Sequence, residues 1–251
     1  MMEGPTRILI RTFMGLTLCA GTLSAQTADD LVAKCVKALG GADQIRAITA
    51  LRRTGRSIGE GGSEVPVVTL TKRPYRFRQE YTTQGLTGIT AYDGKVGWKI
   101  QPWEGKKDPE PLDEEEMKSV MEDADFDGPL VDSREKGISI DYVGMEPVEG
   151  SDTYKLKVTL PDSDFYYYFL DADYFVPIEV ETHRMIRGEE RVYETSLGDY
   201  KEVSGWYLPF STESNVKGSQ DKWKESFDSI QANIPLNDSL FTRPVGPAYS
   251  H

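Results

Sequence analysis

The spacing of hydrophobic residues along the chain changes near Leu51. Before that point, apolar side chains recur every three or four positions, at Leu31, Val32, Cys35, Val36 and Leu39. This period predicts a helix that begins after a capping-type residue, Thr27, and ends at the Gly40-Gly41 pair. The segment Ala42–Ile48 predicts a short second helix, and after Leu51 the period is two, which predicts β-strands.

Most of the chain after Leu51 is predicted to form strands joined by short turns. Apolar and polar residues alternate at Tyr75, Phe77 and Tyr81, then at Tyr154, Leu156, Val158 and Leu160, and again through the segment that holds Ile178 and Val180. Short polar segments, Pro161–Asp164 and Asp171–Asp173, predict turns between these strands. The last strand is predicted at Trp223–Gln231, and the whole pattern indicates an antiparallel meander.

The segment Ile89–Ile100 predicts a β-hairpin, because Asp93-Gly94 is a strong signal for a two-residue loop. Side chains alternate across a strand, so one face of this hairpin is apolar and the other is polar. The apolar face contains Ile89, Ala91, Val96, Trp98 and Ile100. This face either packs into a core or contacts a ligand, and the pattern is the same in both cases.

A helix is predicted between two strands at Pro111–Phe126, where acidic residues occupy the first turn. Its apolar residues, Met117, Val120 and Met121, form a narrow stripe, so we expect a mobile cover over one sheet face. The elements together predict an α+β fold that is mainly antiparallel β. No internal repeat or linker divides residues 26–251, which we expect to form one domain.

The first 25 residues resemble a secretory signal peptide, with Arg7 and Arg11 before a short apolar stretch and Ser24-Ala25 as a small-residue cleavage site. Cleavage near Ala25 would place the mature protein in the periplasm. Leu18 before Cys19 disfavours a lipid anchor at that cysteine. No later stretch is apolar enough to span a membrane.

Composition narrows the possible partners. The full chain has a net charge of −12, and residues 26–251 hold 27 basic and 40 acidic side chains. Such a surface disfavours binding to nucleic acid. Hydrophobic residues make up 38% of the chain, which is enough for a packed core, and we expect a monomer.

Catalytic and metal-binding motifs are scarce. His183 shares strand parity with Glu179 and Glu181, but zinc sites usually need a second His or Cys. Cys35 is best interpreted as a small core residue, with a reactive thiol as the alternative. We find no nucleophile elbow, zinc-protease helix or phosphate-binding glycine loop. We therefore expect a protein that is not an enzyme and needs no cofactor or metal.

Five segments in order resemble the outer-membrane lipoprotein-sorting (LolA-like) proteins: LGGADQIRAITAL, AYDGKVGWKIQPW, VGMEPVEGSDTYKLKVTLPD, YFLDADYFVPIEVE and GDYKEVSGWYLPF. The resemblance extends from about Thr27 to the last strand. It implies a curved, incompletely closed β-barrel with helices that cover the opening. It also implies an arginine that holds the cover, but none of Arg73, Arg76 and Arg78 matches that role residue by residue.

The resemblance implies a periplasmic carrier that holds acyl chains of lipids or lipoproteins in the concave face of the half-barrel. An inner-membrane exporter and an outer-membrane acceptor are the partners that it implies. The residues expected to line the concavity are Tyr75, Phe77, Ile89, Val96, Trp98, Ile100, Tyr154, Leu156, Val158, Ile178 and Val180. The residues expected in the lid are Met117, Val120 and Met121.

Two other hypotheses remain open at this point. The first is a regulatory or structural module of the cell envelope on the same scaffold, with protein partners and a cavity filled by its own helices. The second is an unrecognised hydrolase, which the lack of a nucleophile–base pair disfavours. Lipid extracted from the purified protein would separate the carrier from the module.

Overall fold

The computed structural model describes Met1, residues 26–59 and residues 62–245. The predicted signal peptide therefore lies outside the described residues, apart from Met1. Three α-helices are present in the described part: α1 (Ala28–Ala38), α2 (Ala42–Ala47) and α3 (Glu114–Ala124). Two short 3₁₀ helices are η1 (Pro102–Glu104) and η2 (Asp238–Leu240). None of the described helices has the length and apolar character needed to cross a bilayer.

Thirteen strands form one antiparallel sheet. The first six are β1 (Ala50–Ile58), β2 (Glu64–Lys72), β3 (Arg76–Thr83), β4 (Leu86–Tyr92), β5 (Gly97–Gln101) and β6 (Lys106–Pro111). The other seven are β7 (Ser139–Val148), β8 (Ser151–Thr159), β9 (Phe165–Asp171), β10 (Pro177–Ile186), β11 (Glu189–Val203), β12 (Trp206–Val216) and β13 (Lys222–Ala232). The predicted mainly antiparallel α+β fold is confirmed.

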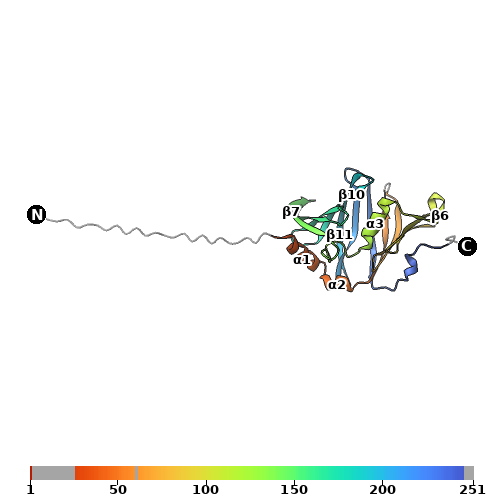
Figure 1. The fold of residues 1–251 in the computed structure, drawn as a ribbon, viewed down its shortest axis with the longest axis horizontal. Helices are drawn as coiled ribbons and strands as arrows, with labels where there is room; N and C mark the ends of the chain where they lie inside the picture. The colour runs from red at the N-terminus through yellow and green to blue at the C-terminus, as the bar shows by residue number, and fades with distance from the viewer. Residues whose placement is uncertain (2–25, 60–61, 246–251) are drawn as a thin grey trace.

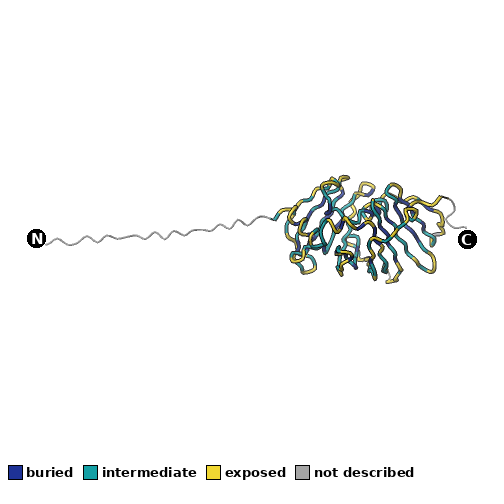
Figure 2. The backbone as a smooth tube through the Cα atoms, turned by 90° about the horizontal axis from the view of Figure 1, so that it is seen from below, coloured by how far each residue is buried: buried dark blue, intermediate teal, exposed yellow. Residues whose placement is uncertain are grey.

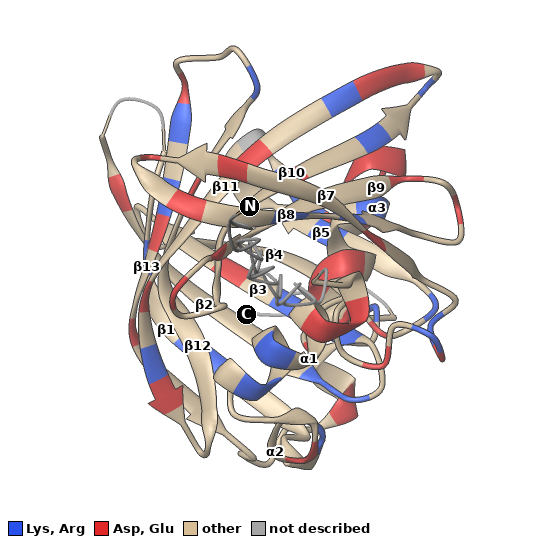
Figure 3. Ribbon diagram, turned by 90° about the vertical axis from the view of Figure 1, so that its left-hand side faces the viewer, with Lys and Arg blue, Asp and Glu red and all other residues tan. Residues whose placement is uncertain are grey.

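The sheet consists of two meanders joined at its centre. Strands β1 to β6 follow one another outward on one side, strands β13 to β7 do the same on the other, and β1 pairs with β13. The edges β6 and β7 therefore remain apart at opposite ends of the molecule (Figure 1). The sheet curves around the helices without closing, as the half-barrel prediction expected (Figure 3).

Helix α1 forms because Thr27 and Asp30 make a reciprocal capping box and because Leu31 and Cys35 share one face. This face packs on the concave side of the second meander, against the buried Leu156 and Val158 of β8. Helix α2 packs at the end of the concavity through Ile45, which contacts a cluster that includes Leu51 and Trp206. Exposed residues gather at the turns, and buried residues follow the strands (Figure 2).

A close backbone approach holds the end of α1 against the turn between β11 and β12. The Tyr207 amide donates to the Leu39 carbonyl at 2.9 Å. Gly40 has a φ of +118°, and a Cβ there would lie 2.0 Å from the Gly205 carbonyl oxygen. Only glycine fits both the backbone conformation and the space at this position.

The hairpin of β4 and β5 has a different strand register from the one predicted, which had a two-residue loop at Asp93-Gly94. Ile89 pairs with Ile100 and Tyr92 with Gly97, so the loop has four residues, Asp93 to Val96. The Asp93 side chain causes this longer loop, since its Oδ1 accepts hydrogen bonds from the amides of Lys95 and Val96 at 2.9 and 2.8 Å. Val96 therefore leaves the strand and is 47% exposed.

The apolar face of this hairpin packs away from α3, against the segment that follows β13. Ile89, Ala91, Trp98 and Ile100 form one buried cluster. The Trp98 indole Nε1 donates to the Phe241 carbonyl at 2.8 Å, and Phe241 itself is fully buried. This C-terminal segment covers the outer face of the first meander (Figure 1).

Candidate functional site

Helix α3 lies on the concave face of the sheet. Asp113 caps it, and the side chains of Asp113 and Glu116 form a second capping box. Val120 and Ala124 are buried against Phe77 of β3 and Tyr92 of β4, and Met117 packs at the edge of this contact. The small residue Gly97 allows the close approach, because a Cβ there would lie 2.6 Å from Leu112 Cδ1.

Polar contacts join α3 to strands in both halves of the sheet. Arg184 of β10 makes a bidentate pair with Glu122, with Nε–Oε1 and Nη2–Oε2 distances of 2.9 and 2.5 Å. Lys99 of β5 pairs with Glu116 at 2.5 Å. Lys118 pairs with Asp164, and the Tyr193 hydroxyl donates to Glu115. Helix α3 is therefore held by ion pairs on both halves of the sheet, and apolar packing on β3 and β4 is added on the first half.

Two cavities flank α3 on the concave face. The first, which we call the polar cavity, has a volume of about 670 Å³ and lies between α3, β1–β3 and β10–β13. Charged and polar side chains dominate its wall, among them Arg53, Gln79, Tyr81, Asp123, Arg184 and Glu225. Its size falls in the range of small-molecule sites.

The second, which we call the apolar cavity, has a volume of about 730 Å³ and lies between α3, β8–β11 and the segment after α3. Most of its open surface is apolar and comes from residues such as Met121, Ile138, Leu160, Pro161, Tyr166, Tyr168 and Val180. Six charged residues also line it: Lys118, Glu122, Asp123, Asp125, Asp162 and Arg184. The two cavities share four lining residues, Asp123, Thr182, Arg184 and Thr195. The two cavities therefore adjoin at these four residues.

Burial changes the ionisation of the groups between the two cavities. Desolvation raises the pKa of Asp123 to about 7, with Glu122 and Glu225 adding to the rise and Arg184 and Arg53 opposing it. Desolvation also raises the pKa of Glu225 and lowers that of Arg53. Asp123 is nevertheless an exposed residue, and it lines both cavities.

Part of the predicted lining lies on the concave face. Phe77 lines the polar cavity and packs in one cluster with Val120 and Ala124 of α3. Val180 lines the apolar cavity and packs against the cluster that includes Leu31 of α1. Tyr154, Leu156 and Val158 face inward as predicted, but α1 packs on them. Among the lid residues, Val120 is buried, Met117 is partly buried, and Met121 is half-exposed at the apolar cavity.

The remaining predicted lining residues lie elsewhere. Ile89, Trp98 and Ile100 lie in the outer cluster under Phe241, and Val96 lies in the exposed loop, so we remove all four from the site. Tyr75 precedes β3 with a φ of +49° and faces the loop after α3. Ile178 occupies a register irregularity in β10 and lines neither cavity.

The sequence interpretation missed the charged residues of the concave face. Arg184 is an even number of positions from Val180 on β10, so both side chains lie on the concave face. A cation on a face with apolar residues was the sequence signal that could have identified Arg184. Arg53 is a similar case, since its parity is that of the buried Leu51. The ion pairs of the three arginines considered earlier are with residues outside α3: Arg73 pairs with Asp127, Arg76 with Asp238 and Arg78 with Glu80.

The other candidate chemistry is weak in this structure. His183 contacts Glu181 and Glu190, but no three His, Cys, Asp or Glu side chains among the described residues are placed so that they could hold a metal ion. Cys35 is fully buried, and burial raises the pKa of its thiol to about 12. The thiol is therefore protonated at neutral pH, which removes the basis for a reactive cysteine.

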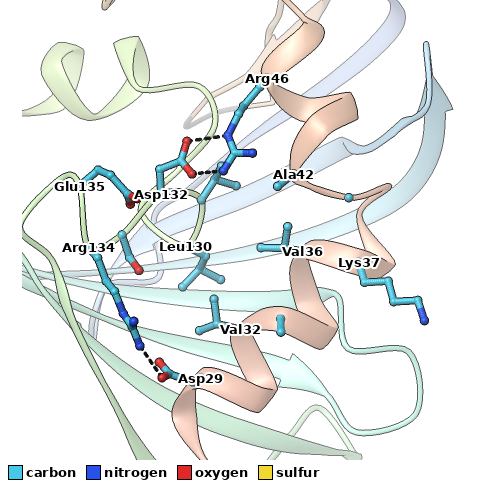
Figure 4. Close-up of a pocket in the computed structure, with 14 residues that line it drawn as sticks. Asp29, Val32, Val36, Lys37, Ala42, Arg46, Leu130, Asp132, Arg134 and Glu135 are labelled. Atoms are coloured by element: carbon cyan, nitrogen blue, oxygen red, sulfur yellow. Dashed lines mark hydrogen bonds and ion pairs between the residues drawn. The ribbon is translucent and has the colours of Figure 1, made fainter.

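A third hollow lies at the end of the molecule between α1, α2 and residues 130–135 (Figure 4). Its two ion pairs, Arg46–Asp132 and Arg134–Asp29, bridge its walls. Val32, Val36 and Leu130 form its floor. This hollow is open and does not connect with the cavities beneath α3 through any lining residue that they share.

Comparison with solved structures identifies the fold. A domain of an outer membrane lipoprotein-sorting protein from Vibrio parahaemolyticus superposes with a TM-score of 0.58 and 9% identity, covering 85% of this chain and 95% of that one. The chain has the LolA-like fold. No protein-family model and no curated protein matches the sequence.

Two further structures support the LolA-like assignment. A LolA superfamily protein from Nitrosomonas europaea has a TM-score of 0.57 and 14% identity, covering 87% of this chain and 98% of that one. A DUF1329 family protein from Desulfovibrio piger has the same TM-score with 10% identity and the same coverage. At these identities the likeness concerns the LolA-like fold.

Proposed function

We propose that the protein is a periplasmic carrier that binds an acyl chain of a lipid or lipidated protein in the apolar cavity beneath α3. The observation that carries this proposal is the cavity itself, which has a volume of about 730 Å³ and a mainly apolar open surface with charged residues beside it. The lipoprotein-sorting description of a protein with the same fold supports it.

A carrier of this kind solves a physical problem of transport. Burial of each CH₂ group is worth ~0.8 kcal/mol, so a chain of ~16 carbons costs ~12 kcal/mol to expose to water. The concave face offers such a chain a wall that includes Leu160, Tyr168 and Val180. In this scheme the donor is an inner-membrane exporter and the acceptor lies at the outer membrane.

Displacement of a fluorescent fatty acid from the purified, delipidated protein tests the proposal. We expect Leu160→Arg to weaken binding strongly, since it places a charge in the apolar wall. Met145→Arg is the matched control, because Met145 is 56% exposed on β7 and lines neither cavity. Native mass spectrometry of the purified protein gives a second readout, as bound lipid adds its mass.

Failure of every lipid to bind the folded wild-type protein would refute the carrier and favour the envelope module with a cavity filled by its own helices. Equal binding by Leu160→Arg and wild type would remove the apolar cavity from the site. The intact mass of periplasmic protein tests localisation, since cleavage near Ala25 leaves a chain that begins at Gln26.

A further inference from the structure

The polar cavity contains two opposite charges that have no partner within the described residues. The Arg53 guanidinium and the Asp123 carboxylate both line this cavity. Neither makes a hydrogen bond or ion pair in the part of the chain that the structure describes, although each lies near enough to shift the pKa of the other. Arg53 is half-buried and Asp123 is exposed, and no neighbour among the described residues neutralises either charge, so both are free to contact a ligand in this cavity.

The other charges of the polar cavity are already engaged. Arg184 pairs with Glu122, and Glu116 pairs with Lys99. Glu115 accepts from the Tyr193 hydroxyl. Arg53, Asp123 and Glu225 are therefore the charged residues that remain available to a ligand.

Glu225 of β13 adds a second acceptor beside Asp123. Its Oε1 accepts hydrogen bonds from Gln79 at 3.2 Å and from Tyr81 at 3.0 Å, while Oε2 has no partner within the described residues. The cavity thus presents one cationic fork and two carboxylates with free oxygens. A guanidinium fork suits a phosphate, and carboxylate oxygens suit an ammonium group.

We propose that the polar cavity binds the zwitterionic head group of a phospholipid-type ligand, with its phosphate against Arg53 and its ammonium group against Asp123 and Glu225. This inference rests on the proposed function, because the acyl chain of the same ligand occupies the apolar cavity. Asp123, Thr182, Arg184 and Thr195 line both cavities, so the two cavities adjoin and one ligand could place its head group in the first and its chain in the second.

Three single-chain probes that differ only in the head group test the assignment: a lysophosphatidylethanolamine, a lysophosphatidylglycerol and a monoacylglycerol. We expect the ethanolamine lipid to bind the wild-type protein about tenfold more tightly than the glycerol phospholipid, since a buried ammonium–carboxylate contact is charge-assisted. The monoacylglycerol should bind with the lowest affinity of the three.

Two substitutions separate the two ends of the head group. Asp123→Asn should reduce the ratio of ethanolamine lipid affinity to glycerol lipid affinity. Arg53→Gln should weaken both phospholipids and leave monoacylglycerol binding unchanged. Glu213→Gln is the matched control, because Glu213 pairs with Lys222 outside the cavities and should change nothing.

Proton linkage gives a readout that a merely structural role would not produce. The raised pKa of Asp123, about 7, means that an ammonium group must bind the ionised form at the expense of the protonated one. Ethanolamine lipid affinity should therefore rise between pH 6 and pH 8, and monoacylglycerol affinity should not. The charged or titratable groups that face Asp123 are Glu122, Arg184, Arg53, Glu225 and Tyr81.

Equal affinity of the wild-type protein for all three probes would overturn this inference and leave the carrier proposal in place. A preference for the glycerol phospholipid would also overturn it. Absence of binding by all three would refute both proposals. Glu225→Gln replaces Asp123→Asn as the carboxylate test in the event that the latter does not fold, and its expected loss of ethanolamine preference is the same.

Discussion

Arg184 on β10 and Glu122 on α3 form a bidentate ion pair across the concave face, with side chains that are 11% and 23% exposed. The pair joins the lid helix to the second meander of the sheet. Burial raises the pKa of Glu122 even with Arg184 beside it. The geometry makes this pair the main charged anchor of α3 on that side.

Removal of one partner should be costly. We expect Arg184→Met to lower the free energy of unfolding by about 3–5 kcal/mol at pH 8, because it leaves the Glu122 charge without a partner. The loss should be smaller at pH 5, where the unpaired Glu122 can take up a proton. Urea unfolding at both pH values measures the difference.

Lys222→Met provides the matched control, since Lys222 and Glu213 form an ion pair on the exposed surface. The expected change there is at most about 1 kcal/mol. A loss at Arg184 no larger than that at Lys222 would contradict an anchoring role for the Arg184–Glu122 pair.

A second prediction concerns Trp98, which is 1% exposed. Trp98→Arg should prevent folding, because it buries a charge between the sheet and the C-terminal segment. Trp98→Phe should cost about 1–3 kcal/mol, since it leaves the Phe241 carbonyl without its donor. Thermal melting and lipid displacement together check this. A folded Trp98→Arg protein with a selective loss of lipid binding would return Trp98 to the ligand site.

The hairpin around Trp98 shows how far the sequence pattern reaches. Alternation correctly grouped Ile89, Ala91, Trp98 and Ile100 on one face. Alternation does not say which face is concave, and here both faces are covered, one by α3 and the other by the segment around Phe241. Apolar residues therefore occur on both sides of these strands, and only the three-dimensional path of the C-terminal segment decides between them.

The charged interior was harder to predict for a related reason. Arg53 and Asp123 are 70 positions apart in the sequence, on β1 and on α3. Their relationship depends on where α3 crosses the concavity, which local periodicity does not encode. The helix itself and its capping residue, by contrast, follow from local signals, and the structure has it at Glu114–Ala124 within the predicted Pro111–Phe126.

The third prediction concerns the pH dependence of stability through Asp123. Its pKa is about 7 in the folded protein against an ordinary value of 3.8, so the folded state binds the proton more tightly. Stability from this group is complete below about pH 4 and is lost as the pH rises through about 7. We expect Asp123→Asn to melt at a higher temperature than wild type at pH 8, and the gap to close near pH 4.

The measurement is a series of thermal melts from pH 4 to pH 8 for both proteins. Glu213→Gln again serves as the control, and its effect has the opposite sign, because the hydrogen bond from Lys222 lowers the pKa of Glu213. Parallel curves for wild type and Asp123→Asn across the range would show that Asp123 has an ordinary pKa.

The fourth prediction uses two adjacent glycines. Gly40 and Gly41 both have positive φ, at +118° and +94°, but only a Cβ at Gly40 would meet another backbone. Gly41→Ala should cost about 1–2 kcal/mol of stability from the backbone conformation alone. Gly40→Ala should cost clearly more, since it also separates α1 from the β11–β12 turn. Equal losses in urea unfolding would rule out a role for the close approach.

The fifth prediction concerns the motion of α3. Only Val120 and Ala124 of this helix are buried, and several of its other contacts are ion pairs. We therefore expect its amides to exchange with solvent before those of β8 (Ser151–Thr159), and to exchange faster at high salt. Hydrogen exchange with mass spectrometry measures both. Protection of α3 equal to that of β8 would rule out a mobile lid.

Each meander is covered by a segment that adjoins the other meander in the sequence. Helix α1 precedes the first meander yet packs on the strands of the second, and the segment with Phe241 follows the second meander yet covers the outside of the first. Each half thus depends on a piece of chain that belongs to the other for a complete core. A reciprocal arrangement of this kind couples the halves thermodynamically, so that loosening either terminus weakens the sheet at its far side. The molecule should accordingly unfold in one cooperative transition, and neither meander should persist as an independent folding unit.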